Sequence, residues 1–325
     1  MIDYSVRPYQ TKDYTLWNTF INEAKNATFL FHRDFIEYHK DRFDDFSLMV
    51  FCKEKLVAVL PANKIEDAVF SHQGLTYGGL VYSDKLKLAT VLTIFQTVLR
   101  FLKNSNINTV NIKTIPAIYH TKPAEELLYA LFLVDAKLHR RDSLSVINLP
   151  NNSHYSTIRK RGIQKGFSND LVIKEVNLFT SFWEEILIPN LEQRHSAKPI
   201  HTLTEIESLQ AKFPKNIRQF NVYYDNKIVA GTTIFESNQV AHAQYISANE
   251  RKNELGSLDF LFHYLITTVF KNKKHFDFGI SNENLGKKLN NGLSYWKESF
   301  GASTIVQDFY EAKTSNYILL DNVMI

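Results

Sequence analysis

One order of elements occurs twice along this chain of 325 residues, and it constrains the fold more than any other feature. In the first half, two strand-like runs, at 56–60 and 69–82, lie on either side of a polar turn at 66–67. A helix-like run follows at 85–103, with apolar residues three and four apart, and leads to a strand at 109–113. This order predicts a hairpin followed by a strand, a crossover helix and a further strand.

The second half repeats the order. Strand-like runs at 228–234 and 240–247 enclose a turn at 237–238, and a helix-like run at 258–270 leads to a strand at 275–280. A strand, a crossover helix and a further strand form a βαβ unit. A chain of this length suits two domains, which we expect at 1–150 and 151–325. We interpret the repeated order as a duplication. The alternative is a pair of generic α/β modules that happen to share this order.

Composition excludes several classes of protein. The net charge of +4 is low for a nucleic-acid partner. Cys52 is the single cysteine, so neither a disulfide within the chain nor a cysteine-based metal site is expected. The first residues lack the apolar core of a signal peptide, and no apolar run reaches the ~18 residues of a membrane span. We therefore expect a cytoplasmic, soluble protein without a metal.

The stretch QYISANERKNELGSLDFLFHYLI, at 244–266, joins a strand to a helix through a charged loop. Gly256 stands at the helix entrance, after Arg251 and Lys252. Such a glycine lets the backbone approach a phosphate, and the N–H groups of the following helix meet the anion at the positive end of the dipole. The stretch is either an ordinary surface loop or an anion-binding cradle.

Several segments of the second half carry a family resemblance, namely 228–231, 241–247, the loop and helix that follow, 276–281 and 297–302. They resemble the GNAT acyltransferase superfamily and its tandem-domain, FemAB-like branch. The resemblance implies an α/β (α+β) fold of two tandem GNAT-like domains, each a mixed, mainly antiparallel twisted sheet flanked by helices. The first domain lacks a comparable loop and is expected to be degenerate.

The resemblance also implies an acyl-CoA site in the second domain. In the family loop, Gln/Arg-x-x-Gly-x-Gly/Ala, Glu254 replaces the first glycine here, so its carboxylate is expected to point to solvent. Pantetheine is expected to pair with the strand as an added β-strand. The residues implied for CoA are Tyr245, Ile246, Ser247, Arg251, Lys252, Asn253, Leu255, Gly256 and Ser257.

Acyl transfer to an amine needs a base for the ammonium and an acid for the leaving group. By resemblance Tyr295 is the candidate acid, and packing beside Trp296 is its alternative role. Glu283 and Asn284 follow the last central strand, where ligands of open α/β sheets gather, although Glu283 also suits a helix N-terminus. His242 is a candidate base because an imidazole has a suitable pKa, and a structural role is its alternative.

Candidate acceptor residues come from three segments. His72 and Tyr77 lie in a glycine-rich run at 71–80, which predicts either close backbone approach or a kinked strand. The basic stretch 154–166 is either a solvated connecting helix or a phosphate-contacting surface. Within it, Arg159 and Lys160 are candidates for contact with the acceptor. A later segment adds Arg194 and His195.

Within the tandem branch the chain resembles FdhC-type nucleotide-sugar N-acyltransferases. This resemblance implies transfer of an acyl group, such as 3-hydroxybutanoyl or acetyl, to a dTDP-linked amino-dideoxyhexose in the biosynthesis of cell-surface polysaccharide. Two alternatives stay open: a FemAB-like aminoacyl transferase acting on a peptidoglycan precursor, and a non-catalytic binding protein on a GNAT scaffold. A homo-oligomer also stays open.

Overall fold

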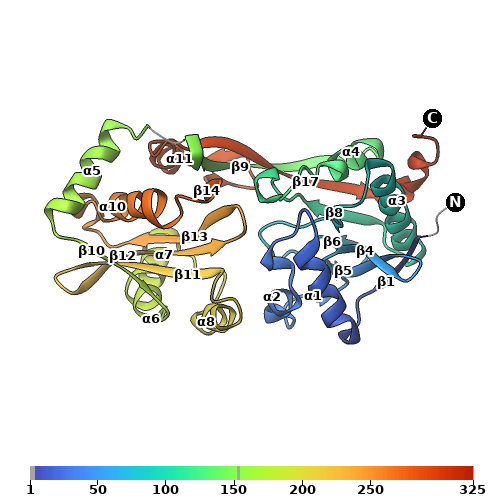
Figure 1. Cartoon of the computed structure of the whole chain (residues 1–325), viewed down its shortest axis with the longest axis horizontal. Coiled ribbons are helices and arrows are strands. Elements are labelled where there is room, and N and C mark those ends of the chain that lie inside the picture. Colours follow the sequence, from blue (N-terminus) through green and yellow to red (C-terminus); the bar gives the residue numbers. More distant parts are fainter. Residues whose placement is uncertain (1–3, 152–153, 325) are drawn as a thin grey trace. The chain divides into compact units, whose positions relative to one another are not determined.

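The computed structural model describes residues 4–151 and 154–324, which form two compact units (Figure 1). Unit 1 comprises 4–142, 285–287 and 306–324, and unit 2 takes the other described residues. The sequence suggests two contiguous halves divided at 150. Instead, residues 306–324 belong to unit 1, because Phe309–Lys313 pair antiparallel with Thr109–Lys113.

Unit 1 contains two sheets, with strand orders β1-β3-β4-β7 and β17-β8-β6-β5-β2. Neighbouring strands are antiparallel in most pairs, and β6 and β8 are parallel. The strands are β1 Tyr4–Pro8, β2 Asp44–Asp45, β3 Leu48–Cys52, β4 Lys55–Leu60, β5 Asn63–Ile65, β6 Ala68–Phe70, β7 Val81–Tyr82, β8 Thr109–Lys113 and the unit 1 part of β17 Ser303–Lys313. The helices are α1 Tyr14–Glu23, α2 Arg33–Ile36, α3 Leu88–Asn104 and α4 Glu126–Leu133.

The α3 helix confirms the amphipathic run expected at 85–103. Its apolar stripe, which includes Val91, Phe95, Val98 and Leu102, is buried in the core of unit 1. The turn expected at 66–67 is also present, and it joins β5 to β6 with Glu66 at a φ of 51°. These elements follow from local pattern, because a helix or hairpin needs few distant contacts to be specified.

The strand expected at 69–82 is interrupted. Only its two ends, in β6 and β7, are strands, and the residues between them form an irregular loop. Gly78 explains the close packing of this loop, since a Cβ there would overlap the carbonyl oxygen of Ser71. The glycines therefore provide close backbone approach, one of the two roles expected for them.

Unit 2 is a six-stranded sheet in the order β10-β11-β12-β13-β14-β9. Its pairs are antiparallel except for the parallel pair β13–β14, which confirms the expected mixed, mainly antiparallel sheet. The strands are the unit 2 part of β9 Lys137–Asn148, β10 Val172–Val176, β11 Ile217–Tyr224, β12 Lys227–Glu236, β13 Val240–Ala248 and β14 His275–Ile280, beside the small hairpin of β15 Asn282–Glu283 and β16 Lys288–Leu289. The helices are α5 Thr157–Ser168, α6 Thr180–Phe182, α7 Ile188–His195, α8 Leu203–Lys212, α9 Lys252–Leu255, α10 Ser257–Tyr264 and α11 Asn291–Glu298.

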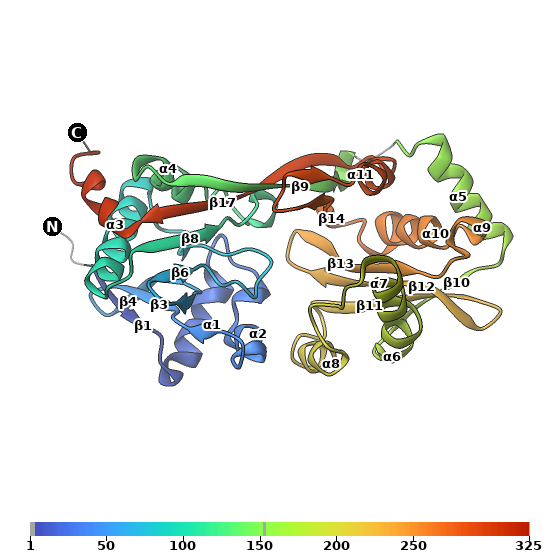
Figure 2. The same cartoon turned by 180° about the vertical axis from the view of Figure 1, so that it is seen from behind.

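Helices cover both faces of the unit 2 sheet. The α10 helix lies on one face, and α6, α7 and α8 lie on the other (Figures 1 and 2). Phe262 of α10 is fully buried against Phe276 and Phe278 of β14. On the opposite face, Phe182 of α6 packs over Gly231, where a Cβ would stand 2.5 Å from its ring. No helix among the described residues is long and apolar enough to cross a membrane.

Candidate functional site

The parallel strands β13 and β14 diverge in the middle of unit 2. Their ladder has three registered pairs and ends at His242 and Asp277. Beyond that point β13 continues to Ala248 and pairs with β12 alone among the described residues. A β-bulge at Gln244 interrupts the pairing with β12 in the same place. Bulges redirect side chains and often lie beside active sites, so the end of this ladder is the candidate site.

His242 and Asp277 form a hydrogen-bonded pair at the point of divergence. Nδ1 of His242 lies 2.9 Å from Oδ2 of Asp277, and the other oxygen, Oδ1, accepts a 2.7 Å bond from the backbone N–H of Gly279. Asp277 is fully buried, whereas the His242 side chain is 12% exposed. A carboxylate accepts, so Nδ1 carries a proton, and Nε2 is the nitrogen with the free lone pair whenever the ring is neutral. The arrangement orients one imidazole nitrogen as a proton acceptor.

Lys297 of α11 lies next to this pair and was not singled out from the sequence. Its side chain is 2% exposed, and Nζ donates to the carbonyl oxygens of Gly279 at 3.0 Å and Ile280 at 2.6 Å. Burial lowers the pKa of this ammonium to about 8, while the Asp277 carboxylate acts in the opposite direction. The sequence gives no periodic signal for it, because α11 has only eight residues.

The side chains expected to line the pantetheine edge point in different directions. The hydroxyl of Tyr245 lies 2.6 Å from Nδ1 of His201. Burial raises the pKa of the Tyr245 hydroxyl to about 12. Ser247 accepts a 3.0 Å hydrogen bond from Asn190 of α7. Ile246 packs on the opposite side, against the core beneath α10. Because these side chains are used within unit 2, backbone groups are what this part of β13 has to offer a ligand.

The charged loop after β13 is internally paired. Arg251 and Glu254 form an ion pair of 2.6 Å, and the Arg251 guanidinium lies 4.9 Å from the centre of the Tyr224 ring. The Glu254 side chain is 61% exposed, so it points to solvent as expected. The backbone N–H groups of Lys252, Leu255 and Gly256 donate to carbonyls of the same loop. Asn253 accepts from Lys165 through its backbone oxygen at 2.8 Å.

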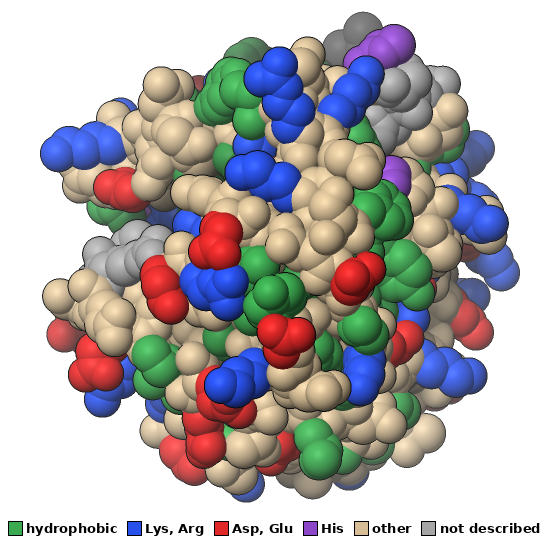
Figure 3. Space-filling model, turned by 90° about the vertical axis from the view of Figure 1, so that its left-hand side faces the viewer, with side chains coloured by type: hydrophobic (Ala, Val, Ile, Leu, Met, Phe, Trp, Pro, Cys, Tyr) green, Lys and Arg blue, Asp and Glu red, His purple; other side chains and the backbone are tan. Residues whose placement is uncertain are grey.

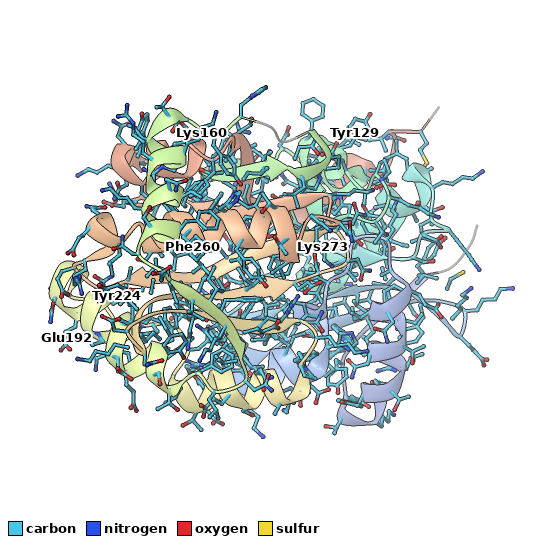
Figure 4. All side chains as sticks on the ribbon, turned by 60° about the vertical axis from the view of Figure 1, so that its left-hand side comes forward. Tyr129, Lys160, Glu192, Tyr224, Phe260 and Lys273 are labelled. Atoms are coloured by element: carbon cyan, nitrogen blue, oxygen red, sulfur yellow. The ribbon has the colours of Figure 1, made fainter. Side chains whose placement is uncertain are left out.

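Gly256 has a structural role in helix packing. It ends α9 with a φ of +69°, and a Cβ there would overlap the carbonyl oxygen of Gly162 in α5. The glycine therefore allows the close approach of a helix, α5, and the expected approach of a phosphate stays a prediction. Ser257 is fully buried, and its hydroxyl has no hydrogen-bond partner among the described residues. Figure 4 shows α5 and α10 side by side, with Lys160 and Phe260 labelled on them.

The other catalytic candidates do not contact the His242 pair. Tyr295 is 54% exposed on α11 and does not pack in the core as Trp296 does. Glu283 is exposed on β15 and accepts from Asn290 at 3.2 Å. Asn284 is exposed in the turn after β15, with a φ of 49°. In the described part of unit 2, none of the three hydrogen-bonds to His242.

Two acceptor candidates prove to be internal. Tyr77 is 3% exposed and donates to Thr28 at 3.0 Å, so the expectation that it contacts a substrate is wrong. Arg159 forms an ion pair with Asp259 of α10, and its side chain is 12% exposed. Burial raises the pKa of Asp259, and the Arg159 charge opposes that shift. Arg159 therefore joins α5 to α10 instead of offering a surface charge.

The remaining candidates are placed as follows. His72 is 2% exposed in unit 1. Lys160 is exposed on α5, and the end of the molecule seen in Figure 3 shows basic and acidic side chains interspersed. The side chains of Arg194 and His195 lie outside the described part of the structure.

No family model and no curated protein matches the sequence. Solved structures nevertheless resemble it closely in fold. A structure of FemX has a TM-score of 0.67 at 9% identity, over 94% of this chain and 96% of that chain. A conserved protein of unknown function from Bacteroides thetaiotaomicron has a TM-score of 0.56 at 10% identity, over 96% and 99% of the two chains.

A third structure, L-PGS from Bacillus licheniformis, has a TM-score of 0.54 at 10% identity, over 81% of this chain and 85% of that chain. At such low identity these likenesses show the fold alone. The fold agrees with the expected pair of units, each with a mainly antiparallel sheet flanked by helices, and the FemX comparison covers nearly all of both chains.

Proposed function

We propose that unit 2 transfers an acyl group from an activated donor to a primary amine, with His242 as the general base. The observation that carries this proposal is the His242–Asp277 pair at the point where β13 and β14 diverge, beside the bulge at Gln244. A donor lying along the free edge of β13 brings its carbonyl to the end of the ladder.

The chemistry follows from the pair. Nε2 of His242 takes a proton from the substrate ammonium, and the amine nitrogen then attacks the acyl carbon. The carbon–sulfur or carbon–oxygen bond to the carrier breaks, the leaving group takes up the second proton that the nitrogen loses, and the imidazolium returns its proton to solvent. Asp277 positions the imidazole and stabilises the imidazolium, as in other histidine–aspartate pairs. A thioester or an ester is already activated, so positioning supplies much of the rate.

Acyl-CoA is the donor that we propose first, because the β13 edge suits an added pantetheine strand. An aminoacyl ester is the second candidate donor, and a specific observation favours it. The loop at 251–256 donates its N–H groups internally and packs against α5, so it has few groups left for a pyrophosphate. The fold likeness to FemX agrees with this second candidate.

For the acceptor we propose the amine of a nucleotide-linked amino sugar of the dTDP-amino-dideoxyhexose type, with a role in cell-surface polysaccharide. Its support is the sequence resemblance to FdhC-type enzymes. Among the basic residues of α5, Lys160 is exposed and fits a diphosphate contact, whereas Arg159 is committed to Asp259.

The test is a transfer assay on the purified chain. Acetyl-CoA and 3-hydroxybutanoyl-CoA are each incubated with a panel of dTDP-amino sugars while thiol release is followed, and aminoacyl-tRNA is tested in parallel with a labelled amino acid. With the active donor, His242→Gln should lower kcat by about 10²- to 10⁴-fold. The exposed His154→Gln is the matched control and should leave kcat unchanged.

Three results separate the alternatives. Turnover with acyl-CoA supports the first donor, and turnover with aminoacyl-tRNA alone supports the second. Binding of the donor without turnover supports a binding protein and refutes the proposed reaction, if His242→Gln binds the donor with the same affinity as the wild type.

A further inference from the structure

Unit 1 repeats the short parallel ladder of unit 2, and a cavity lies near the end of this ladder. Its parallel strands β6 and β8 also have three registered pairs, ending at Phe70 and Asn111. A cavity of about 270 Å³ lies there, bordered by β6, β8, β9, β17 and the loop after β6. This volume is near the lower end of the ~300–1,000 Å³ of ligand sites. Apolar cavities of about 150 Å³ already admit benzene.

Strand register explains why the floor of the cavity is polar and aromatic. Phe70 pairs with Asn111, and Phe309 pairs with Lys113 two residues further along β8. Side chains alternate along a strand, so these four lie on one face of the sheet. The alternate residues, Val110 and Ile112, face the core of unit 1. The floor therefore has two aromatic residues with an amide and an ammonium between them.

Two cations border the cavity. Lys113 donates through Nζ to the carbonyl oxygen of Leu75, and burial lowers its pKa to about 8, with the nearby Arg140 charge acting in the same direction. The Arg140 guanidinium lies 4.4 Å from the centre of the Phe309 ring and binds Asp142 through both oxygens, at 3.0 and 2.6 Å. Asp142 neutralises one of the two cations, so this cluster holds one positive charge in excess.

His72 adds a buried polar group with an unused nitrogen. Its imidazole is 2% exposed, and Nδ1 has no hydrogen-bond partner among the described residues. Burial lowers the pKa of this imidazole to about 3, so the ring is neutral at physiological pH. His72 also lines a second cavity, of about 420 Å³. A buried nitrogen without a partner is costly, and a polar ligand would satisfy it.

We propose that the cavity between β6 and β8 binds a small organic anion, with its acidic group at Lys113 and Arg140 and a flat apolar body against Phe70 and Phe309. The acidic group is a carboxylate or a phosphate monoester, since both match an ammonium beside a guanidinium. This site lies within unit 1. It goes beyond the proposed transfer reaction and does not depend on which donor unit 2 uses.

Direct binding to the full chain tests the proposal. Benzoate, phenyl phosphate, inorganic phosphate and the neutral benzamide are titrated by calorimetry, with saturation-transfer NMR as a second measurement. We expect saturable binding of benzoate or phenyl phosphate, and the stronger of the two identifies the acidic group. Inorganic phosphate should bind more weakly because it lacks the apolar body. Failure of both aromatic anions to bind, or equal binding of benzamide, overturns the proposal.

Three variants locate the site. Lys113→Met should weaken binding of the aromatic anion by at least about tenfold, the usual scale for losing a hydrogen bond to a charged group. Because Lys113 also holds a loop carbonyl, Asn111→Phe provides a second test that fills the cavity and keeps the cation. Lys137→Met, on an exposed part of β9, is the control and should bind as wild type does. Unchanged affinity in both test variants overturns the assignment.

Discussion

Replacing Lys297 with methionine should change how the stability of unit 2 depends on pH. The lysine is 2% exposed and has a pKa of about 8, against 10.5 for an ordinary lysine. Below pH 8 both the folded and the unfolded chain carry this proton, and the folded chain bears the full cost of a buried charge. Between pH 8 and 10.5 the unfolded chain binds more protons, so the free energy of unfolding rises with pH. A difference of about 2.5 pKa units corresponds to about 3 kcal/mol.

Lys297→Met is close in shape and does not titrate, so it should lack this rise. Urea unfolding at pH 7, 9 and 10.5 is followed by fluorescence of Trp183 and Trp296, with Trp17 of unit 1 replaced by phenylalanine in both proteins, and measures the free energy of unfolding of unit 2. The wild-type value minus the variant value should increase by about 3 kcal/mol across this range. Lys271→Met, at an exposed lysine of unit 2, should show no such trend. A flat difference for Lys297→Met would mean that the ammonium is not desolvated and would refute the argument.

Three further predictions concern single contacts. Gly162→Ala should destabilise unit 2 by about 1–3 kcal/mol, because the new methyl group would overlap the Asp259 carboxylate. Gly292→Ala should have almost no effect, since its nearest neighbour is 3.8 Å away, and thermal unfolding compares the two. Asp277→Asn should lower kcat strongly with little change in KM, because it removes the acceptor that orients His242; a loss confined to KM would contradict a positioning role. Anion affinity at Lys113 should fall as pH rises through about 8, since Arg140 stays charged, Asp142 stays paired and His72 stays neutral; calorimetry at pH 7 and 9 checks this, and equal affinities would contradict it.

Elements with a strong local pattern could be predicted from the sequence. The apolar spacing of 85–103 led to α3, and the strand at 240–247 led to β13, within a few residues of the observed bounds. His242 was also identified, since alternation along β13 separates it from the buried alanines on either side. Its partner, Asp277, was not identified, because the pairing depends on the register of two strands 35 residues apart. Short-range patterns carry no information on such a register.

Burial of polar and aromatic residues was harder to predict. Tyr77 stands among glycines and resembles a ligand-binding residue, yet it is packed in the core of unit 1 with its hydroxyl satisfied by Thr28. Tyr295 and Lys297 are two residues apart on a helix of eight residues, and the tyrosine is exposed while the lysine is buried. Because lysine is almost never buried, sequence reasoning prefers the tyrosine. The helix is too short for its buried face to be assigned by periodicity.

The return of residues 306–324 to unit 1 affects the order in which the protein is completed during synthesis. When the ribosome has made most of unit 1, strand β8 still lacks the neighbour that Phe309–Lys313 provide, and nearly 200 residues must be translated before that neighbour appears. At about 5–20 residues per second this interval lasts on the order of ten seconds or more. During that time β8 is an open sheet edge, the kind of surface on which nascent chains associate wrongly. A chaperone that covers an exposed strand would therefore act on unit 1 while unit 2 is still being synthesised.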